Sequence, residues 1–303
     1  MFADLSTCVF ERQKRVNIAL TTNANIRDIF IVSPDRILLS NSKGTVKLVD
    51  TNDGQLLSEV SVPVTLTDRF LGSSWRLFLT RNDRAAVSHF KKVQFINIQC
   101  QSITLGTVLA LNYESRDVST CGENDLVVSY QKAPWLEVIS PDGSVRHQFH
   151  QIGQTSHFKY PDYLTTSVNG YVYVSDRGTN KITKLDSSLQ LLQTFSDPLL
   201  NKPRTIISVS PDQILVCSYV YRNNSIVLLN TRTCKSSVLL EECLHGSPLS
   251  LISYCPEQYK LYVTRELFLY VYTLSPISYA KPKPLCKCNK CTDLEILSPR
   301  WIN

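Results

Sequence analysis

Apolar and polar residues alternate along residues 160–195, which read YPDYLTTSVNGYVYVSDRGTNKITKLDSSLQLLQTF. The alternation has a period of two and is interrupted by short polar segments, so it predicts β-strands rather than helices. The expected strands are Tyr163–Ser167, Tyr171–Asp176, Lys181–Asp186 and Leu189–Phe195. An Asn-Gly pair between the first two is a strong hairpin signal. Four short antiparallel strands bury too little apolar surface to be stable alone, so this unit needs neighbours of the same kind.

The second strand of this unit recurs along the whole chain. Matching apolar segments begin at or near Arg36, Arg84, Asp125, Tyr171, Gln213 and Tyr259. The interval is about 45 residues, and a second apolar segment follows each of them. Six copies of a four-stranded unit at this period predict an all-β fold, a six-bladed β-propeller with four-stranded antiparallel blades.

The sixth blade lacks an outer strand of its own, because a Pro-rich segment follows residue 275. The alternating run at residues 14–20 can supply the missing strand, so the ring is expected to close through its N-terminal strand, which leaves no free edge in the sheet. We therefore divide the chain into a leader (1–13), the propeller (14–275) and a Pro/Lys/Cys-rich tail (276–303). The expected blades are 26–61, 75–108, 116–150, 160–195, 203–240 and 248–274.

Within the fourth unit, the segment DRGTNKITKLD (residues 176–186) has an Asp, a Gly, and then a basic residue followed by Ile ahead of an outer strand. This pattern resembles the signature of NHL repeats, and the chain is similar to the six-bladed NHL propeller at the C-terminus of tripartite-motif (TRIM-NHL) proteins. The first and fifth units keep the outline of the signature, and the others have drifted from it. The resemblance implies a domain that binds proteins or RNA. Relatives often carry RING, B-box and coiled-coil parts that act in ubiquitin ligation, and none of these is recognisable in this sequence.

Bulk composition adds few constraints. The 303 residues match six blades, and 43% apolar residues allow a sizeable core. The net charge of +6 is compatible with an anionic partner without requiring one. No secretory h-region or long apolar run is visible, so we expect ten reduced cysteines, a cytoplasmic location, no membrane contact and a monomeric ring.

A ring of cations is the first candidate site. In a propeller, the loops between the second and third strands of the blades lie on one face around the channel, and here each of these loops contains a basic residue. The residues are Lys43, Lys91, Lys92, Lys132, Arg177, Arg222 and Arg265. Converging cations attract phosphates or acidic peptides. Nearby aromatics that could stack on bases are Phe90, Tyr219 and Tyr221. The plain alternative is that Lys and Arg simply favour exposed loops.

A metal-dependent site is the second candidate. Gluconolactonase-type enzymes are also six-bladed and hold a divalent cation with carboxylate and amide ligands on the channel axis. Asp28, Asp117 and Asp162 stand at or near the starts of inner strands, where they could converge. Arg204 occupies the matching place in the fifth blade, and Asp side chains at such places usually cap turns.

The tail carries the third candidate, in Cys286, Cys288 and Cys291. Thiolates at this spacing can bind zinc, but a closed site needs four ligands and no fourth Cys or His follows. The alternative is a solvated, redox-sensitive tail. No HExxH, Gly-x-Ser-x-Gly or phosphate-binding glycine-rich motif occurs. The sequence therefore predicts a non-catalytic protein-binding module without a cofactor; an RNA-binding propeller and a metal-dependent lactonase or esterase are the alternatives.

Overall fold

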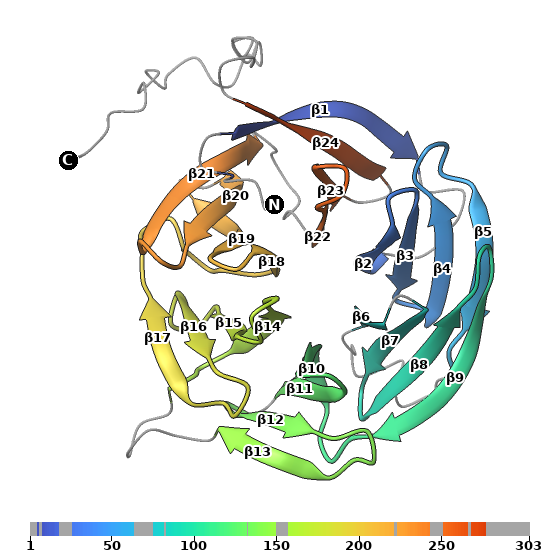
Figure 1. Cartoon of the computed structure of the whole chain (residues 1–303), viewed down its shortest axis with the longest axis horizontal. Coiled ribbons are helices and arrows are strands. Elements are labelled where there is room, and N and C mark those ends of the chain that lie inside the picture. The colour runs from blue at the N-terminus through green and yellow to red at the C-terminus, as the bar shows by residue number, and fades with distance from the viewer. Residues whose placement is uncertain are drawn as a thin grey trace.

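The computed structural model describes residues 5, 8–17, 26–63, 75–81, 83–131, 133–149, 157–220, 223–242, 251–265 and 268–276. The strands in these ranges form six separate antiparallel sheets of four strands. The sheets stand around a central axis like the blades of a propeller, with the first strand of each blade innermost (Figure 1). The predicted fold class is confirmed.

Blades one to three are consecutive in sequence. Blade one contains β2 (Ile26–Ser33), β3 (Arg36–Asn41), β4 (Thr45–Asp50) and β5 (Leu56–Ser61). Blade two contains β6 (Arg76–Arg81), β7 (Arg84–His89), β8 (Lys92–Ile98) and β9 (Ile103–Ala110). Blade three contains β10 (Ser115–Cys121), β11 (Asp125–Tyr130), β12 (Leu136–Ile139) and β13 (Val145–Phe149).

Blades four and five follow the same order, and blade six borrows its last strand. Blade four contains β14 (Pro161–Thr166), β15 (Val172–Asp176), β16 (Lys181–Leu185) and β17 (Leu191–Phe195). Blade five contains β18 (Ile206–Ser210), β19 (Gln213–Val220), β20 (Asn223–Asn230) and β21 (Lys235–Glu242). Blade six contains β22 (Leu251–Cys255), β23 (Lys260–Arg265), β24 (Phe268–Pro276) and β1 (Cys8–Asn17). The six recurring segments of the sequence are the second strands, β3 to β23 in steps of four.

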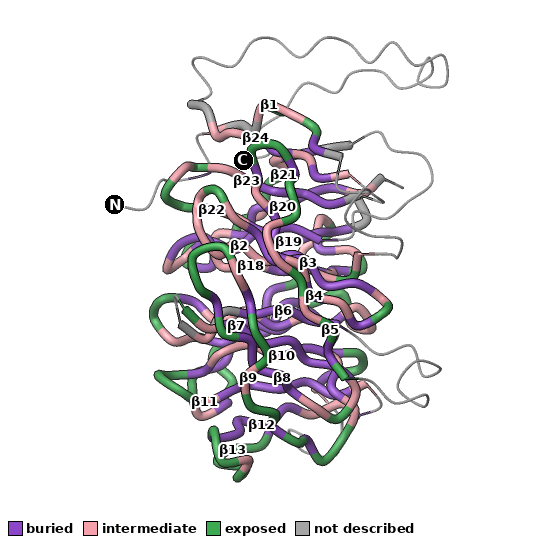
Figure 2. The backbone as a smooth tube through the Cα atoms, turned by 90° about the vertical axis from the view of Figure 1, so that its right-hand side faces the viewer, coloured by how far each residue is buried: buried purple, intermediate pink, exposed green. Residues whose placement is uncertain are grey.

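The core lies between blades rather than within them. The second and third strands are buried, whereas the outer strands are largely exposed (Figure 2). Each of six apolar clusters joins two neighbouring blades; one of them packs Leu48 of blade one against Val87 and Ile96 of blade two. Because a blade has both faces covered by its neighbours, its central strands can be continuously apolar. This arrangement places the apolar core between the blades and leaves the loops at the two faces of the ring (Figure 1).

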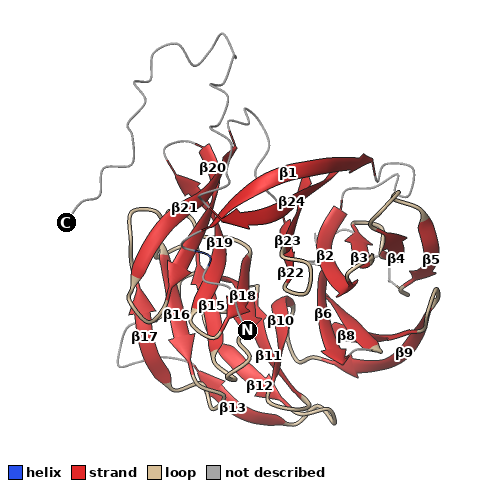
Figure 3. Cartoon of the chain, turned by 45° about the horizontal axis from the view of Figure 1, so that its top comes forward, coloured by secondary structure: helices blue, strands red, loops and turns tan. Residues whose placement is uncertain are grey.

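The N-terminal strand closes the ring, as the sequence predicts. β1 pairs antiparallel with β24 from Cys8↔Pro276 to Asn17↔Phe268, and the two strands lie side by side in Figure 3. The strand begins at Cys8, inside the segment expected to be a leader, and residues 18–20 of the expected strand lie outside the described ranges. Leu5 is also buried, at 1% exposure, in the cluster between blades five and six. The strand begins six residues earlier than expected because the polar residues 11–13 hide the alternation. An outer strand is held by backbone pairing more than by apolar side chains, so these polar residues do not end it.

Candidate binding groove across blades two to four

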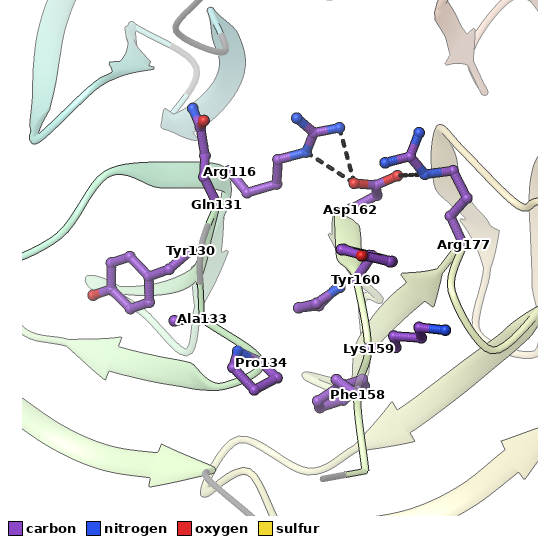
Figure 4. Close-up of a pocket in the computed structure, with 11 residues that line it drawn as sticks. Arg116, Tyr130, Gln131, Ala133, Pro134, Phe158, Lys159, Tyr160, Asp162 and Arg177 are labelled. Atoms are coloured by element: carbon purple, nitrogen blue, oxygen red, sulfur yellow. Dashed lines mark hydrogen bonds and ion pairs between the residues drawn. The ribbon is translucent and has the colours of Figure 1, made fainter. Parts of the chain in front are cut away.

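One face of the ring is hollowed between blades three and four. The pocket has a volume of about 410 Å³ and lies where the β11–β12 loop faces the start of β14 (Figure 4). Its lining is Arg116, Tyr130, Gln131, Ala133, Pro134, Phe158, Lys159, Tyr160, Pro161, Asp162 and Arg177. A second pocket of about 230 Å³ shares Tyr130 and Ala133 with the first and adds Lys91, Tyr113, Glu114 and Trp135. We call the two pockets together the groove.

An ion cluster of one carboxylate and two guanidinium groups forms the polar part of the groove. Asp162 is 4% exposed, and its Oδ1 accepts a hydrogen bond from Nε of Arg116 at 2.9 Å and lies 2.9 Å from Nη2 of the same arginine in an ion pair. Its Oδ2 lies 2.8 Å from Nε of Arg177. Figure 4 shows the two arginines on opposite sides of the carboxylate. The cluster carries one net positive charge and joins blade three to blade four.

Asp176, the last residue of β15, fixes the loop that carries Arg177. Its carboxylate accepts hydrogen bonds from four backbone N–H groups, those of Lys159, Tyr160, Gly178 and Thr179, at 2.6 to 3.2 Å. The first two donors belong to the segment entering β14 and the last two to the β15–β16 loop. This is the Asp of the NHL-like signature, and it holds the two sides of the pocket together. A buried carboxylate with four donors is a rigid support for the groove.

Aromatic side chains form the other wall. Tyr113 makes edge-on contacts with Tyr130 and Trp135, with ring centroids 5.6 and 5.5 Å apart. Tyr130 is buried and donates its hydroxyl to the buried Glu137, and burial together with this acceptor raises the pKa of Tyr130 well above its ordinary value. Tyr113 and Tyr160 are 48% and 52% exposed. The groove therefore offers aromatic surface that the fold itself leaves uncovered.

Asp28 and Asp117 belong to a separate cluster around the guanidinium of Arg76 on the inner strands. Asp28 accepts backbone N–H groups from Ile29 and, in the next blade, from Leu77 at 2.7 Å. Asp117 accepts backbone N–H groups from Val118 and, in the next blade, from Leu164 at 2.7 Å. Loss of hydration raises the pKa of Asp28 to about 6 and that of Asp117 to about 7, although the Arg76 cation acts in the opposite direction. These carboxylates hold inner strands of neighbouring blades together.

Asp162 does not occupy the same repeat position as the other two predicted metal ligands. Asp28 pairs with Ser40 and Asp117 with Ser129, whereas in blade four Tyr163 pairs with the matching Ser175. A β-bulge precedes each of these positions, and Asp162 lies within the bulge of its blade, as Arg116 does in blade three. In the structure, Asp162 is paired with Arg116 and Arg177 and does not lie in the repeat position of Asp28 and Asp117. Across the described ranges, no three His, Cys, Asp or Glu side chains are placed to hold a metal ion together.

The predicted ring of cations is described only in part. Lys43 and Lys91 are exposed in their loops, Lys92 is half-buried at the start of β8, and Arg177 is paired with Asp162. Lys132 and Arg222 lie outside the described residues, as do Cys286, Cys288 and Cys291, and for Arg265 only the backbone is described. Of the ring, Lys91 and Arg177 line the groove. The basic face remains a prediction.

The sequence does not point to five of the residues that line the groove, namely Arg116, Tyr113, Tyr130, Trp135 and Tyr160. The sequence nominates Phe90 as a stacking residue, and in the structure it lies in the β7–β8 turn with a positive φ of 50°. Tyr130 ends β11 as Asp176 ends β15, so the two residues occupy the same place in the repeat. Because the NHL-like pattern singles out Asp176, the residue at the same place in blade three is a signal that could have identified Tyr130. Arg116 and Asp162 share the bulge position, which the spacing of apolar residues does not reveal.

Comparison with known proteins identifies the fold and leaves the family open. No protein-family model and no curated protein matches the sequence. A solved structure of virginiamycin B lyase from Staphylococcus aureus is similar, with a TM-score of 0.60 and 13% identity over 87% of this chain and 88% of that one. In the described ranges there is also no helix long and apolar enough to cross a bilayer. At this identity the similarity shows a shared propeller fold and nothing about chemistry.

Proposed function

We propose that this propeller is a non-catalytic recognition module, as the resemblance to TRIM-NHL substrate-recognition domains implies, and that it binds a segment of a partner protein in the groove. The observation that carries the proposal is the exposure of Tyr160 in the pocket of the two arginines and of Tyr113 in the adjoining pocket. Tyrosine and arginine dominate the energetics of protein interfaces, and fixed aromatic rings lose little entropy on binding.

The charges of the groove favour a protein segment over RNA. Asp162 neutralises one of its two arginines, and Lys91 shares its pocket with Glu114. A surface that tracks a nucleic-acid backbone needs many uncompensated cations, because each phosphate contact displaces counterions. The lining of the groove has four cations and two anions beside aromatic surface, and this mixture of both signs with tyrosine and arginine is the composition of a protein interface.

A selection of random displayed peptides against the purified chain tests this proposal. Peptides that enrich should bind in fluorescence polarisation, and Tyr113→Asn and Tyr160→Asn should each weaken binding about tenfold or more. Tyr259→Asn is the matched control, because Tyr259 is 43% exposed in the β22–β23 turn at the opposite ends of the strands. Binding that is unchanged in the two groove variants would place recognition elsewhere.

Single-stranded RNAs at two salt concentrations provide the second arm, and salt-sensitive RNA binding without peptide binding would favour the nucleic-acid alternative.

The metal-dependent lactonase or esterase alternative has its own test. A resident divalent cation raises the melting temperature of the protein that binds it. Added calcium or magnesium should leave the melting temperature unchanged if Asp28 and Asp117 serve only to join blades. An increase that disappears in Asp28→Asn would support the enzymatic alternative over the binding module.

A further inference from the structure

Two arginines share a single carboxylate at the groove, and this leaves positive charge facing solvent. The side chain of Asp162 is 5% exposed, whereas those of Arg116 and Arg177 are 31% and 40% exposed. The carboxylate is therefore enclosed and the guanidinium groups are open to the pocket. With Lys159 also lining it, the pocket carries two net positive charges (three cations and one anion).

The two guanidinium groups have donors left over. A guanidinium presents five N–H groups in a planar fork. Arg116 uses Nε and Nη2 on Asp162, and Arg177 uses Nε. Within the described part of the chain, no group accepts a hydrogen bond from Nη1 of Arg116 or from either Nη atom of Arg177. Figure 4 shows these atoms on the two sides of the carboxylate, which orients both groups.

The surroundings of the two arginines select the kind of anion. The exposed ring of Tyr160 lies under Arg177, with the guanidinium carbon 5.9 Å from the ring centroid, and Ala133 and Pro134 form an apolar side. An anion joined to an organic arm can use both parts of the pocket, and a volume of about 410 Å³ accommodates a side chain with some of its backbone.

We propose that Arg116 and Arg177 bind the terminal oxyanion of a partner side chain, a carboxylate or a phosphoryl group, with the arm of that side chain against Tyr160. Asp162 is a positioning residue that holds the two arginines in place. The inference rests on the proposed function, because the anion belongs to the segment bound in the groove. Charge-assisted hydrogen bonds to a planar guanidinium are the strong polar contacts that such a ligand would gain.

The first experiment asks whether the cluster binds oxyanions at all. Inorganic phosphate and acetate are titrated at constant ionic strength, and the Nε–Hε resonances of arginine are followed by ¹⁵N NMR. Saturable shifts of Arg116 and Arg177 with millimolar affinity are expected, and Arg177→Gln should weaken binding about tenfold. Arg146→Gln is the matched control, because Arg146 makes a 3.2 Å ion pair with Asp125 on blade three, away from the groove. Equal effects of the two variants, or shifts that never saturate, would overturn the proposal.

The second experiment separates this proposal from the proposed function and identifies the source of the oxyanion. Peptides selected against the groove are synthesised with each Asp or Glu changed to Ala, and with a phosphoserine or phosphotyrosine in its place. A carboxylate is supported if the change to Ala weakens binding to the wild type but has no further effect in Arg116→Gln. A phosphoryl group is supported if the phosphorylated peptide binds more tightly than the original one. If the peptides bind through Tyr113 and Tyr160 but ignore both arginine variants, the groove is a protein site and the oxyanion proposal fails. If phosphate binds the cluster but no peptide does, the proposed function fails and RNA becomes the ligand to test.

Discussion

Removal of the Asp176 carboxylate should destabilise the ring and open the groove. This side chain is 1% exposed, and its two oxygens accept four backbone N–H groups. In Asp176→Ala these donors lose their acceptor in a site that water reaches poorly. An unsatisfied buried donor costs about 1 kcal/mol or more, and bonds to a charged group cost more. The four bonds share one carboxylate, so their losses do not add fully, and we expect the free energy of unfolding to fall by about 3–5 kcal/mol.

Asp176→Asn divides this loss in a way that the geometry specifies. Oδ1 accepts three of the four donors, from Tyr160, Gly178 and Thr179, while Oδ2 accepts only the N–H of Lys159. An asparagine can keep its oxygen on the three and turn its amide nitrogen toward the fourth. The expected loss is then about 1–2 kcal/mol, for one hydrogen bond and the repulsion between two donors.

Urea unfolding followed by tryptophan fluorescence measures the loss, and hydrogen exchange shows where it occurs. Amides of Lys159, Tyr160, Gly178 and Thr179 should exchange faster in Asp176→Ala, and those of distant blades should change less. Asp186→Ala is the control, because Asp186 makes two similar bonds, to Ser188 and Gln190, in a half-buried turn of the same blade. It should cost about 1 kcal/mol or less. The reasoning is refuted if Asp176→Ala costs no more than this control, or if Asp176→Asn costs as much as Asp176→Ala.

Three further predictions concern other parts of the ring. Burial raises the pKa of Asp28 to about 6 and that of Asp117 to about 7 from the ordinary value of 3.8. The folded state therefore holds protons that the unfolded chain has lost, so the free energy of unfolding should fall as pH rises from about 4 to about 7, and urea midpoints that rise over this interval would contradict this. Leu5→Ala should lower the free energy of unfolding by about 2–4 kcal/mol, since the side chain is 1% exposed in the cluster of blades five and six; a thermal melt like that of the wild type would show that this contact is absent in solution. Gly178→Ala places a Cβ 2.6 Å from the ring of Tyr160, so we expect about 1–3 kcal/mol of destabilisation and weaker peptide binding, and unchanged affinity would mean that the groove adjusts freely.

The sequence predicts the strands well because the signals that define them are local. The segments that begin at Arg36, Arg84 and Asp125 become β3, β7 and β11 with the same first residue, since alternation and turn chemistry act over a few neighbours. The closing strand was predicted to begin at Lys14 and begins at Cys8. The missing outer strand of blade six predicts its pairing with β24, but how far a pairing between the two ends of the fold extends is not set by local alternation.

The groove was harder to predict, because its residues come from places where the repeat is irregular. Arg116 and Asp162 lie in bulges, where one extra residue changes the alignment of everything before it. The same bulge precedes Asp28 and Asp117, so Asp162 lies one residue earlier in the repeat than they do, a difference that spacing counted from the start of a strand does not reveal. Asp176 was recognised as part of a signature, and its four backbone bonds give the physical reason for an acidic residue at that position.

The pairing of β1 with β24 also determines how the ring would respond to tension. The strands are antiparallel, so the end of β1 at Cys8 lies opposite the end of β24 at Pro276. A force that pulls these two ends apart would act on one interstrand pair at a time and unzip the seam toward Asn17 and Phe268. A pair loaded in shear would instead share the force among all its bonds. We expect the ring to open at low force when it is pulled from Cys8 and Pro276, although interblade clusters pack its blades together, and single-molecule force spectroscopy can measure this.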